Sequence, residues 1–203
     1  MSPYEKIPKS KWKEITEKII QEHPLDMKDI IDSVFESWDG ILRTKIAGEL
    51  QIGKDIFPSP QILGNYLHEL IPVFLSRKFK DKWRKEQDKS DKDLVYIPNN
   101  YYSIEIKTSS NATNIYGNRS YGQKNSVNNS GKSKDGYYLT VNFEKFDPKN
   151  PEFTPSIRKI RFGWIDHSDW RSQASSTGQQ ASLDIDARDK KLKLLYDKND
   201  KVR

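Results

Sequence analysis

The sequence predicts an α/β fold with a helical segment at the N-terminus. Three observations support this prediction. Apolar residues recur at helical spacing over 12–42 and again over 60–75. Residues 93–110 have the alternation and the central turn of a β-hairpin, and two further strand-like runs follow at 137–143 and 157–165. A chain of 203 residues is long enough for one domain of this kind.

The composition narrows the class of protein. Only 34% of the residues are apolar, but eight Phe, ten Tyr and five Trp can still form a core. No apolar run is long enough to cross a membrane, and the N-terminus lacks the apolar segment of a secretory signal. The absence of cysteine excludes disulfides and thiolate zinc sites. We therefore expect an intracellular, cytoplasmic protein that does not enter a membrane.

Charge is unevenly distributed along the chain. The whole net charge of +6 comes from residues 94–203, which contain 18 Lys and Arg against 12 Asp and Glu. From Lys107 to Lys134 there are five basic residues and no acidic one. Such an excess suits a polyanionic partner such as a nucleic acid. An ordinary basic loop is the alternative interpretation.

The N-terminal segment predicts two packing helices without candidate chemistry. We expect Ser10 to cap the first helix and Pro24 to end it. Asp26 is expected to cap the second helix, whose apolar stripe ends near Leu42. Gly40 could divide this second helix into two pieces.

A third helix is predicted from Pro60, with Ser59 as its N-cap. Glu69 lies at the margin of its apolar stripe, from where the side chain could face the hairpin. An ordinary surface glutamate is an equally good interpretation. The following residues, 77–85, are strongly basic and could lie along a phosphate backbone or simply form a solvated helix face.

The hairpin contains the main candidate site. Glu105 and Lys107 are two residues apart in its second strand, predicted over 101–108, so both side chains lie on one side of the sheet. Asp93 precedes the first strand, predicted over 94–97, and folding back could bring its carboxylate near Glu105. Two carboxylates and a lysine can hold a divalent metal and hydrolyse a phosphodiester, with the nearby metal and desolvation lowering the lysine pKa. The alternative is a cross-strand salt bridge on a solvated face.

Two polar segments are candidates for nucleic-acid recognition. Residues 111–134 are rich in Asn, Ser and Gly and predict a long loop, and 171–181 predict a second one. Arg, Asn and Gln are the side chains that read base edges. The candidate DNA contacts, including the end of the hairpin, are Lys107, Thr108, Ser109, Ser110, Asn118, Arg119, Tyr121, Gln123, Lys124, Arg171, Gln173, Gln179 and Gln180. A flexible insertion is the alternative, and residues 191–196 predict a last strand or helix.

These motifs resemble the PD-(D/E)XK nuclease superfamily, although Lys92 stands where the name has proline. Within it, the chain is similar to the ScaI group of type II restriction endonucleases. The similar segments are IEIKTSS (104–110), NRSYGQ (118–123), GYYLTVNFEKF (136–146), IRFGWIDHSDW (160–170) and TGQQASL (177–183). The resemblance implies a central mixed β-sheet flanked by helices. It covers about residues 58–183 of a single endonuclease domain, 1–203, which adds N-terminal helices (1–57) and a C-terminal segment (184–203).

The resemblance also implies roles for individual residues. Asp93 and Glu105 would be Mg²⁺ ligands, and Lys107 would orient or activate the attacking water. Glu69 would be the auxiliary helix glutamate that binds a second metal or its water, with Glu49 as a rival.

The implied activity is Mg²⁺-dependent hydrolysis of double-stranded DNA at a short palindrome by a homodimer. A nicking or junction-cleaving nuclease of the same superfamily is one alternative. A non-catalytic DNA-binding module is a second, and an interaction protein with an acidic partner is a third.

Overall fold

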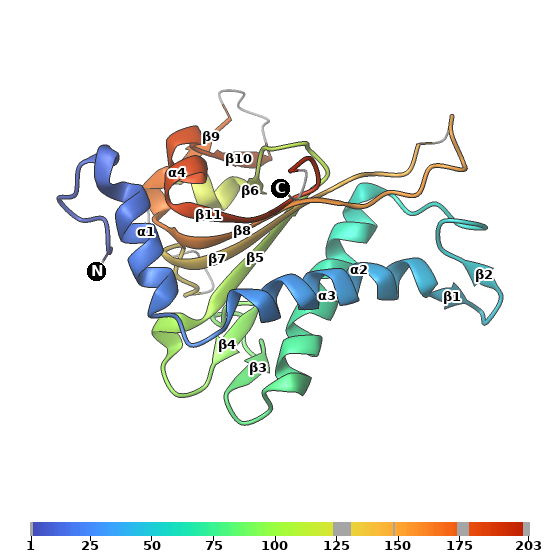
Figure 1. Cartoon of the computed structure of the whole chain (residues 1–203), viewed down its shortest axis with the longest axis horizontal. Coiled ribbons are helices and arrows are strands. Elements are labelled where there is room, and N and C mark those ends of the chain that lie inside the picture. Colours follow the sequence, from blue (N-terminus) through green and yellow to red (C-terminus); the bar gives the residue numbers. More distant parts are fainter. Residues whose placement is uncertain (1, 124–130, 148, 174–178, 201–203) are drawn as a thin grey trace.

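A six-stranded mixed β-sheet forms the centre of the protein (Figure 1). The computed structural model describes residues 2–123, 131–147, 149–173 and 179–200. Across the sheet the strands follow the order β11 (Leu192–Asp197), β8 (Ile157–Ile165), β7 (Gly136–Phe143), β5 (Ile104–Ser109), β4 (Leu94–Tyr96) and β3 (Trp83–Lys85). Only β5 and β7 pair in parallel, and all other neighbours are antiparallel. The predicted α/β fold with a central mixed sheet is confirmed, and it is consistent with a PD-(D/E)XK-like core.

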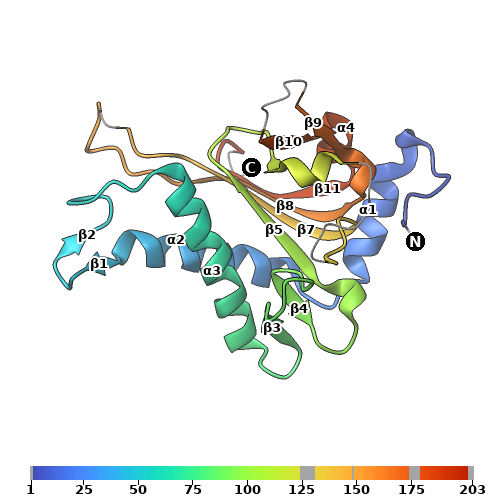
Figure 2. The same cartoon turned by 180° about the vertical axis from the view of Figure 1, so that it is seen from behind.

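Both faces of the sheet are covered, which explains why every residue of β7 is buried. On one face, α1 (Trp12–Gln21), α2 (Met27–Arg43) and α3 (Pro60–Lys78) pack apolar side chains against Ile104, Ile106 and Leu139. Figure 2 shows the ribbons of α2 and α3 on this side of the sheet. A smaller core on the other face contains Tyr121 and Tyr138. In the described ranges no helix is long and apolar enough to cross a membrane.

The helix boundaries agree with the sequence except at the first cap and at the end of α3. The expected helix face over 77–85 is wrong, because α3 ends at Lys78 and residues 83–85 form β3. Asp26 caps α2 by accepting a hydrogen bond from the Lys28 N–H at 2.7 Å. The prediction for Ser10 is wrong, because this residue lies inside a 3₁₀ turn, Lys9–Lys11, that runs directly into α1. Gly40 does not divide α2, which continues to Arg43.

The hairpin forms, but its second strand starts later than predicted. Residues Asn100–Tyr102 form a 3₁₀ turn in which the Asn99 side chain accepts a hydrogen bond from the Tyr101 N–H at 3.0 Å. Asn side chains favour such local bonds over strand pairing. The strand therefore begins at Ile104, which pairs with Leu94 across the hairpin.

The polar segments contain a second sheet that the sequence analysis missed. Its strands follow the antiparallel order β6 (Tyr116–Asn118), β10 (Gln180–Leu183) and β9 (Trp170–Ser172). A 3₁₀ turn, Arg119–Gly122, follows β6, and α4 (Ile185–Lys190) leads into β11. A short ribbon of β1 (Lys45–Ile46) and β2 (Leu50–Gln51) follows α2. The second sheet lies on the face of the main sheet opposite α2 and α3 (Figure 2).

Candidate active site

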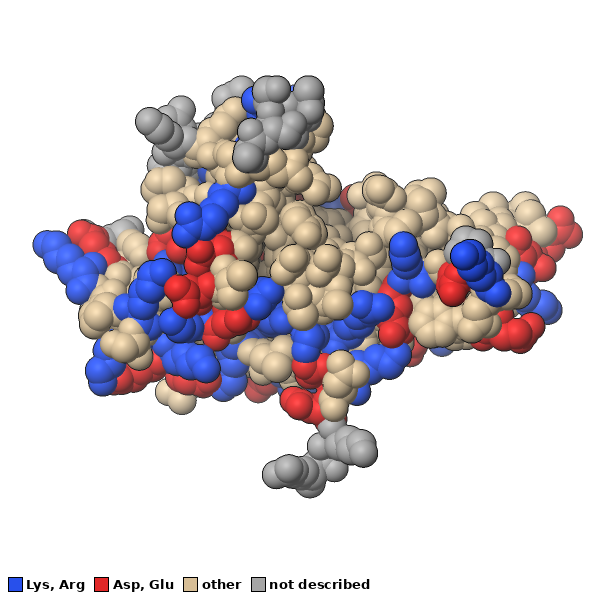
Figure 3. All heavy atoms as spheres, turned by 90° about the horizontal axis from the view of Figure 1, so that it is seen from above, with Lys and Arg blue, Asp and Glu red and all other residues tan. Residues whose placement is uncertain are grey.

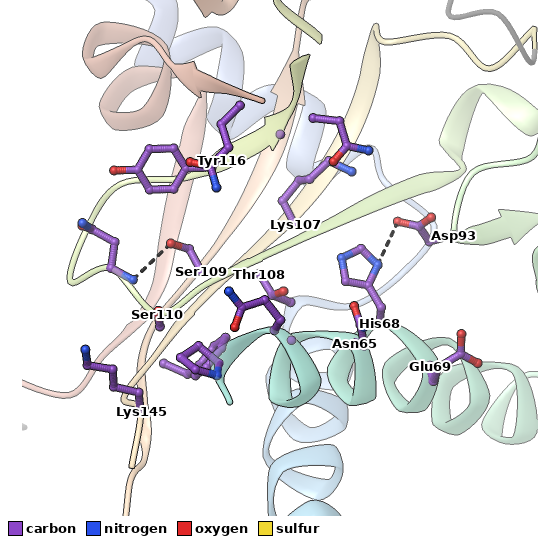
Figure 4. A pocket seen from close by; sticks show the side chains of 18 of the residues that line it. Asn65, His68, Glu69, Asp93, Lys107, Thr108, Ser109, Ser110, Tyr116 and Lys145 are labelled. Carbon is purple, nitrogen blue, oxygen red and sulfur yellow. Dashed lines mark hydrogen bonds and ion pairs between the residues drawn. The ribbon is translucent and has the colours of Figure 1, made fainter. Parts of the chain in front are cut away.

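An open cleft of about 990 Å³ lies between α3, the end of β5 and the edge of the second sheet. Figure 4 shows its walls, with His68 and Glu69 on α3 and Tyr116 on β6. Asp93 and Lys107 line the cleft, and Glu105 is buried next to them.

The predicted pair in β5 adopts the predicted orientation. Lys107 Nζ donates to Glu105 Oε1 at 2.7 Å, so both side chains lie on the same side of the sheet. Asp93 Oδ2 accepts a hydrogen bond from the Ile106 N–H at 2.6 Å, which attaches this carboxylate to β5. The side chains of Asp93 and Glu105 are only 12% and 3% exposed. The alternative of a solvated salt bridge is therefore wrong.

A second lysine bridges the two carboxylates. Lys132 Nζ lies 2.9 Å from Asp93 Oδ1 and 2.8 Å from Glu105 Oε2. Apart from this ion pair, Glu105 Oε2 accepts no hydrogen bond of normal geometry from the residues that the structure describes. From the sequence, Lys132 is predicted only as part of a basic loop, because no local pattern indicates where the connection between β5 and β7 returns to the sheet.

The charges in the site stabilise one another. Burial alone would raise the pKa of Glu105, but Lys107, Lys92 and Lys132 outweigh it and hold that pKa below its usual range. Burial alone would lower the pKa of Lys107, but Glu105 and Asp93 raise it above the usual value. The lowering of the Lys107 pKa that is expected beside a bound metal stays a prediction. The site contains an ionised carboxylate beside a protonated lysine.

The side chain that α3 brings to Asp93 is His68. Its Nδ1 lies 3.6 Å from Asp93 Oδ2, as the dashed line in Figure 4 marks. Glu69 instead lies on the rim of the cleft, 61% exposed, where it pairs with Lys85. Glu49 is exposed in the turn between β1 and β2. Neither predicted glutamate is brought together with Asp93 and Glu105.

Asp93 and Glu105 can bind a divalent metal when water and phosphate oxygens supply the remaining ligands. No three His, Asp or Glu side chains of the described ranges converge into a metal-binding group. Mg²⁺ is commonly bound by one or two carboxylates, with water and phosphate oxygens completing the shell. The position of the Lys132 ammonium between two carboxylate oxygens shows that a cation is accommodated there.

Some predicted DNA contacts converge on the cleft. Lys107, Thr108, Ser109 and Ser110 line one wall, and Asn118 and Gln180, directly paired across β6 and β10, line another. Apart from Tyr121, the remaining candidates that the structure describes are exposed on the second sheet and its connections, namely Arg119, Gln123, Arg171, Gln173 and Gln179. Of these, Arg171 pairs with Asp184 at 2.6 Å. The prediction for Lys124 falls outside the described residues.

Tyr121 is a correction to the predicted DNA contacts. Only 5% of this residue is exposed, and its ring packs against Trp170. Its hydroxyl donates a hydrogen bond to Glu105 Oε1 at 2.7 Å, and Lys107 Nζ lies 4.7 Å from the ring centroid. Tyr121 therefore supports the carboxylate–lysine pair and does not face DNA.

The surface charge is more mixed than the sequence counts suggest. Figure 3 shows lysines and arginines interleaved with acidic side chains over the visible face, without one uniform basic patch. Many basic residues are paired, as Lys78 is with Asp29 and Arg84 with Asp91. Polar side chains in the cleft are therefore the more specific indication of a nucleic-acid site.

Comparison with known proteins agrees with this geometry. The family model described as ScaI restriction endonuclease matches residues 2–196. The type II restriction enzyme ScaI of Streptomyces caespitosus is 45% identical over 182 residues, which cover 90% of this chain and 79% of that protein. The range matched by the family model includes all the site residues described above and both sheets except the last residue of β11. The chain therefore belongs to the ScaI restriction endonuclease family and is a site-specific deoxyribonuclease.

Proposed function

We propose that the protein is a single endonuclease domain that cuts double-stranded DNA at a short palindrome, with Mg²⁺ bound by Asp93 and Glu105. The observation that supports this most directly is the convergence of two enclosed carboxylates with Lys107 beside the cleft. A non-catalytic DNA-binding module would not need buried carboxylates next to its DNA surface, since burying charge is costly unless it is used or compensated.

The metal would be held by the oxygens that now face Lys132. These are Oδ1 of Asp93 and Oε2 of Glu105. Mg²⁺ bound there would supply Lewis-acid polarisation of the phosphate and a bound water of lowered pKa. The second oxygen of each carboxylate is already used: Oδ2 by the Ile106 N–H, and Oε1 by Lys107 and Tyr121.

Lys107 acts as a fixed cation in this proposal. Its ammonium group donates a hydrogen bond to Glu105 Oε1 at 2.7 Å, which fixes the position of the charge. It would orient the attacking water and balance negative charge at the scissile phosphate. Glu69 is outside the metal site that we propose, because it pairs with Lys85 on the rim.

Recognition is assigned to the walls of the cleft and the second sheet. Hydroxyls at the end of β5, from Thr108, Ser109 and Ser110, suit phosphate oxygens, which position the duplex. Asn118 and Gln180 suit base edges, because amides pair with adenine in the major groove. Arg119, Gln123, Lys124, Arg171, Gln173 and Gln179 remain candidates for further contacts.

A homodimer would match the two-fold symmetry of a palindrome. Among the residues that the structure describes, eight large apolar side chains are exposed, and four of them lie between residues 46 and 62. They are Ile46, Leu50, Phe57 and Ile62. We place the dimer contact on this segment, because exposed apolar side chains that concentrate in one region mark interaction surfaces.

The test is a digest of a large unmethylated DNA with Mg²⁺ or EDTA, using the wild-type protein and Lys107→Ala. Lys18→Ala is the control, since Lys18 is exposed on α1 and does not line the cleft. We expect discrete fragments with Mg²⁺ for the wild type and the control, and at least a hundredfold loss of cleavage with retained DNA binding for Lys107→Ala. Unimpaired cutting by Lys107→Ala would remove its catalytic role. A supercoiled plasmid separates double-strand cleavage from nicking.

A further inference from the structure

His68 is the side chain of α3 that reaches the carboxylate site. Its Nδ1 lies 3.6 Å from Asp93 Oδ2, slightly beyond hydrogen-bond length, and its side chain is 31% exposed toward the cleft. The same Oδ2 accepts the Ile106 N–H at 2.6 Å. Figure 4 shows His68 between α3 and Asp93. Catalytic contacts are often long before substrate binds and shorten in the complex.

The position of His68 is fixed by close packing of α3 on the sheet. Leu67 and Ile71, which flank it on the helix, are fully buried in the core. One turn earlier, a Cβ at Gly64 would lie only 2.8 Å from Thr108 Oγ1, so the helix approaches β5 closely. This packing holds the imidazole at the wall of the cleft.

The ring nitrogen of His68 that faces Asp93 is Nδ1. A neutral imidazole has one N–H donor and one acceptor nitrogen. A carboxylate opposite Nδ1 favours the tautomer with the proton on Nδ1, which leaves Nε2 without the proton.

We propose that His68 is a positioning residue that holds Asp93 Oδ2 through Nδ1–H, so that Oδ1 faces the metal. This inference rests on the proposed metal site. With a metal in the position of the Lys132 ammonium, the Ile106 N–H and His68 would be the groups left among the described residues to orient the carboxylate. Partners of metal ligands typically contribute about 10- to 100-fold in metal affinity or activity.

The experiment measures Mn²⁺ binding to the full-length protein by electron paramagnetic resonance, without DNA. The variants are His68→Ala, His68→Asn and His68→Gln, with Glu69→Gln as the neighbouring control on the same helix. The Asn amide nitrogen is attached to Cγ, as Nδ1 is, whereas the Gln amide nitrogen reaches the position of Nε2. We expect about tenfold weaker binding for His68→Ala and His68→Gln, recovery to within about threefold for His68→Asn, and no change for Glu69→Gln.

The outcomes separate this inference from the metal site itself. If Asp93→Asn loses Mn²⁺ binding while His68→Ala keeps it, the role of His68 is wrong and the metal site stands. If Asp93→Asn binds Mn²⁺ normally, the metal site is wrong. Recovery by Gln but not by Asn would assign the function to Nε2 and overturn the proposal.

A cleavage assay gives a second readout. Since a positioning residue acts through the metal, His68→Ala should raise the Mg²⁺ concentration for half-maximal cleavage about tenfold and approach the wild-type rate at saturating Mg²⁺. An unchanged Mg²⁺ dependence would overturn the proposal. Thermal unfolding without metal verifies that each variant is folded.

Discussion

The hydroxyl of Tyr121 donates to a carboxylate of the main sheet, while its ring belongs to the core under the second sheet. The residue thus joins the two sheets at the site. Without the hydroxyl, Glu105 Oε1 would keep Lys107 as its hydrogen-bond donor. A buried carboxylate that loses one of two donors is less well fixed.

Tyr121→Phe should therefore weaken Mg²⁺-dependent cleavage without weakening DNA binding. We expect an approximately tenfold increase in the Mg²⁺ concentration for half-maximal cleavage. The packing on Trp170 is preserved because only the hydroxyl is removed. Tyr101→Phe, which removes the hydroxyl of an exposed tyrosine outside the site, is the control. A loss of DNA affinity in EDTA would instead support the original interpretation of Tyr121 as a DNA contact.

His23 is buried as a neutral imidazole between the N-terminal helices and the sheet. Nε2 lies 3.1 Å from the Tyr102 carbonyl oxygen and donates to it, while Nδ1 accepts the Leu25 N–H at 3.2 Å. Burial lowers the pKa of His23 from 6.5 to about 4. Between these two values the unfolded chain binds a proton that the folded protein does not.

The free energy of unfolding should consequently fall as the pH decreases from about 6.5 toward 4. For His23 alone we expect a loss of about 2 kcal/mol between neutral pH and about pH 5. Urea unfolding of wild type and His23→Gln at several pH values measures it. The variant is less stable at neutral pH but should show the smaller decrease. Parallel pH profiles would show that His23 does not contribute.

The positions of individual side chains were predictable where strand periodicity alone determines them. The alternation of β5 is enough to put Glu105 and Lys107 on one side, and hairpin folding is enough to bring Asp93 near. The prediction chose Glu69 where the structure has His68. Adjacent residues on a helix point in directions about 100° apart, and the apolar stripe of α3 does not distinguish these two positions. The positions of Lys132 and Tyr121 depend on a connection with no repeating pattern.

At the scale of elements, the contact between α3 and β5 determines the width of the cleft. Gly64 has no side chain to separate the helix from Thr108. Both residues line the cleft, so any displacement there also moves His68.

Gly64→Ala should cost about 1–2 kcal/mol of folding free energy, because the new methyl group overlaps Thr108 Oγ1. Thr108→Ala removes that atom, so the double variant should recover part of the loss. A double-mutant cycle of urea unfolding free energies measures this coupling. Additive effects would mean that the helix packs without strain in the single variant.

The elements missed from the sequence are short and polar. Strands β6, β9 and β10 contain three, three and four residues, too few to establish an alternation. Ile115, Ala181 and Leu183 are buried beneath them, but they are scattered among Asn, Ser and Gln in the sequence. The long helices and the strands β7 and β8 were predictable because their patterns extend over eight residues or more.

At the scale of the whole molecule, the ribbon of β1 and β2 projects from the end of α2 (Figure 1). Ile46 and Leu50 are directly paired on it and each 42% exposed. If the dimer forms there, the wild type should be dimeric and the double variant Ile46→Asp/Leu50→Asp monomeric. Light scattering measures the two molar masses. Ile185→Asp, at a site 65% exposed on α4, should remain dimeric. A dimer that survives the double variant would place the interface elsewhere.

The parallel pairing of β5 and β7 requires the chain to cross back between them, and this crossover contains Asn118, Tyr121 and Lys132. Asn118 is proposed to read bases, Tyr121 supports Glu105, and the Lys132 ammonium lies between the carboxylates. All three are therefore inherited together in one stretch of about 25 residues. Replacing this stretch to change the target preference would therefore also replace groups that the nuclease needs for cleavage. Grafting it between relatives should succeed only when β5 is transferred with it.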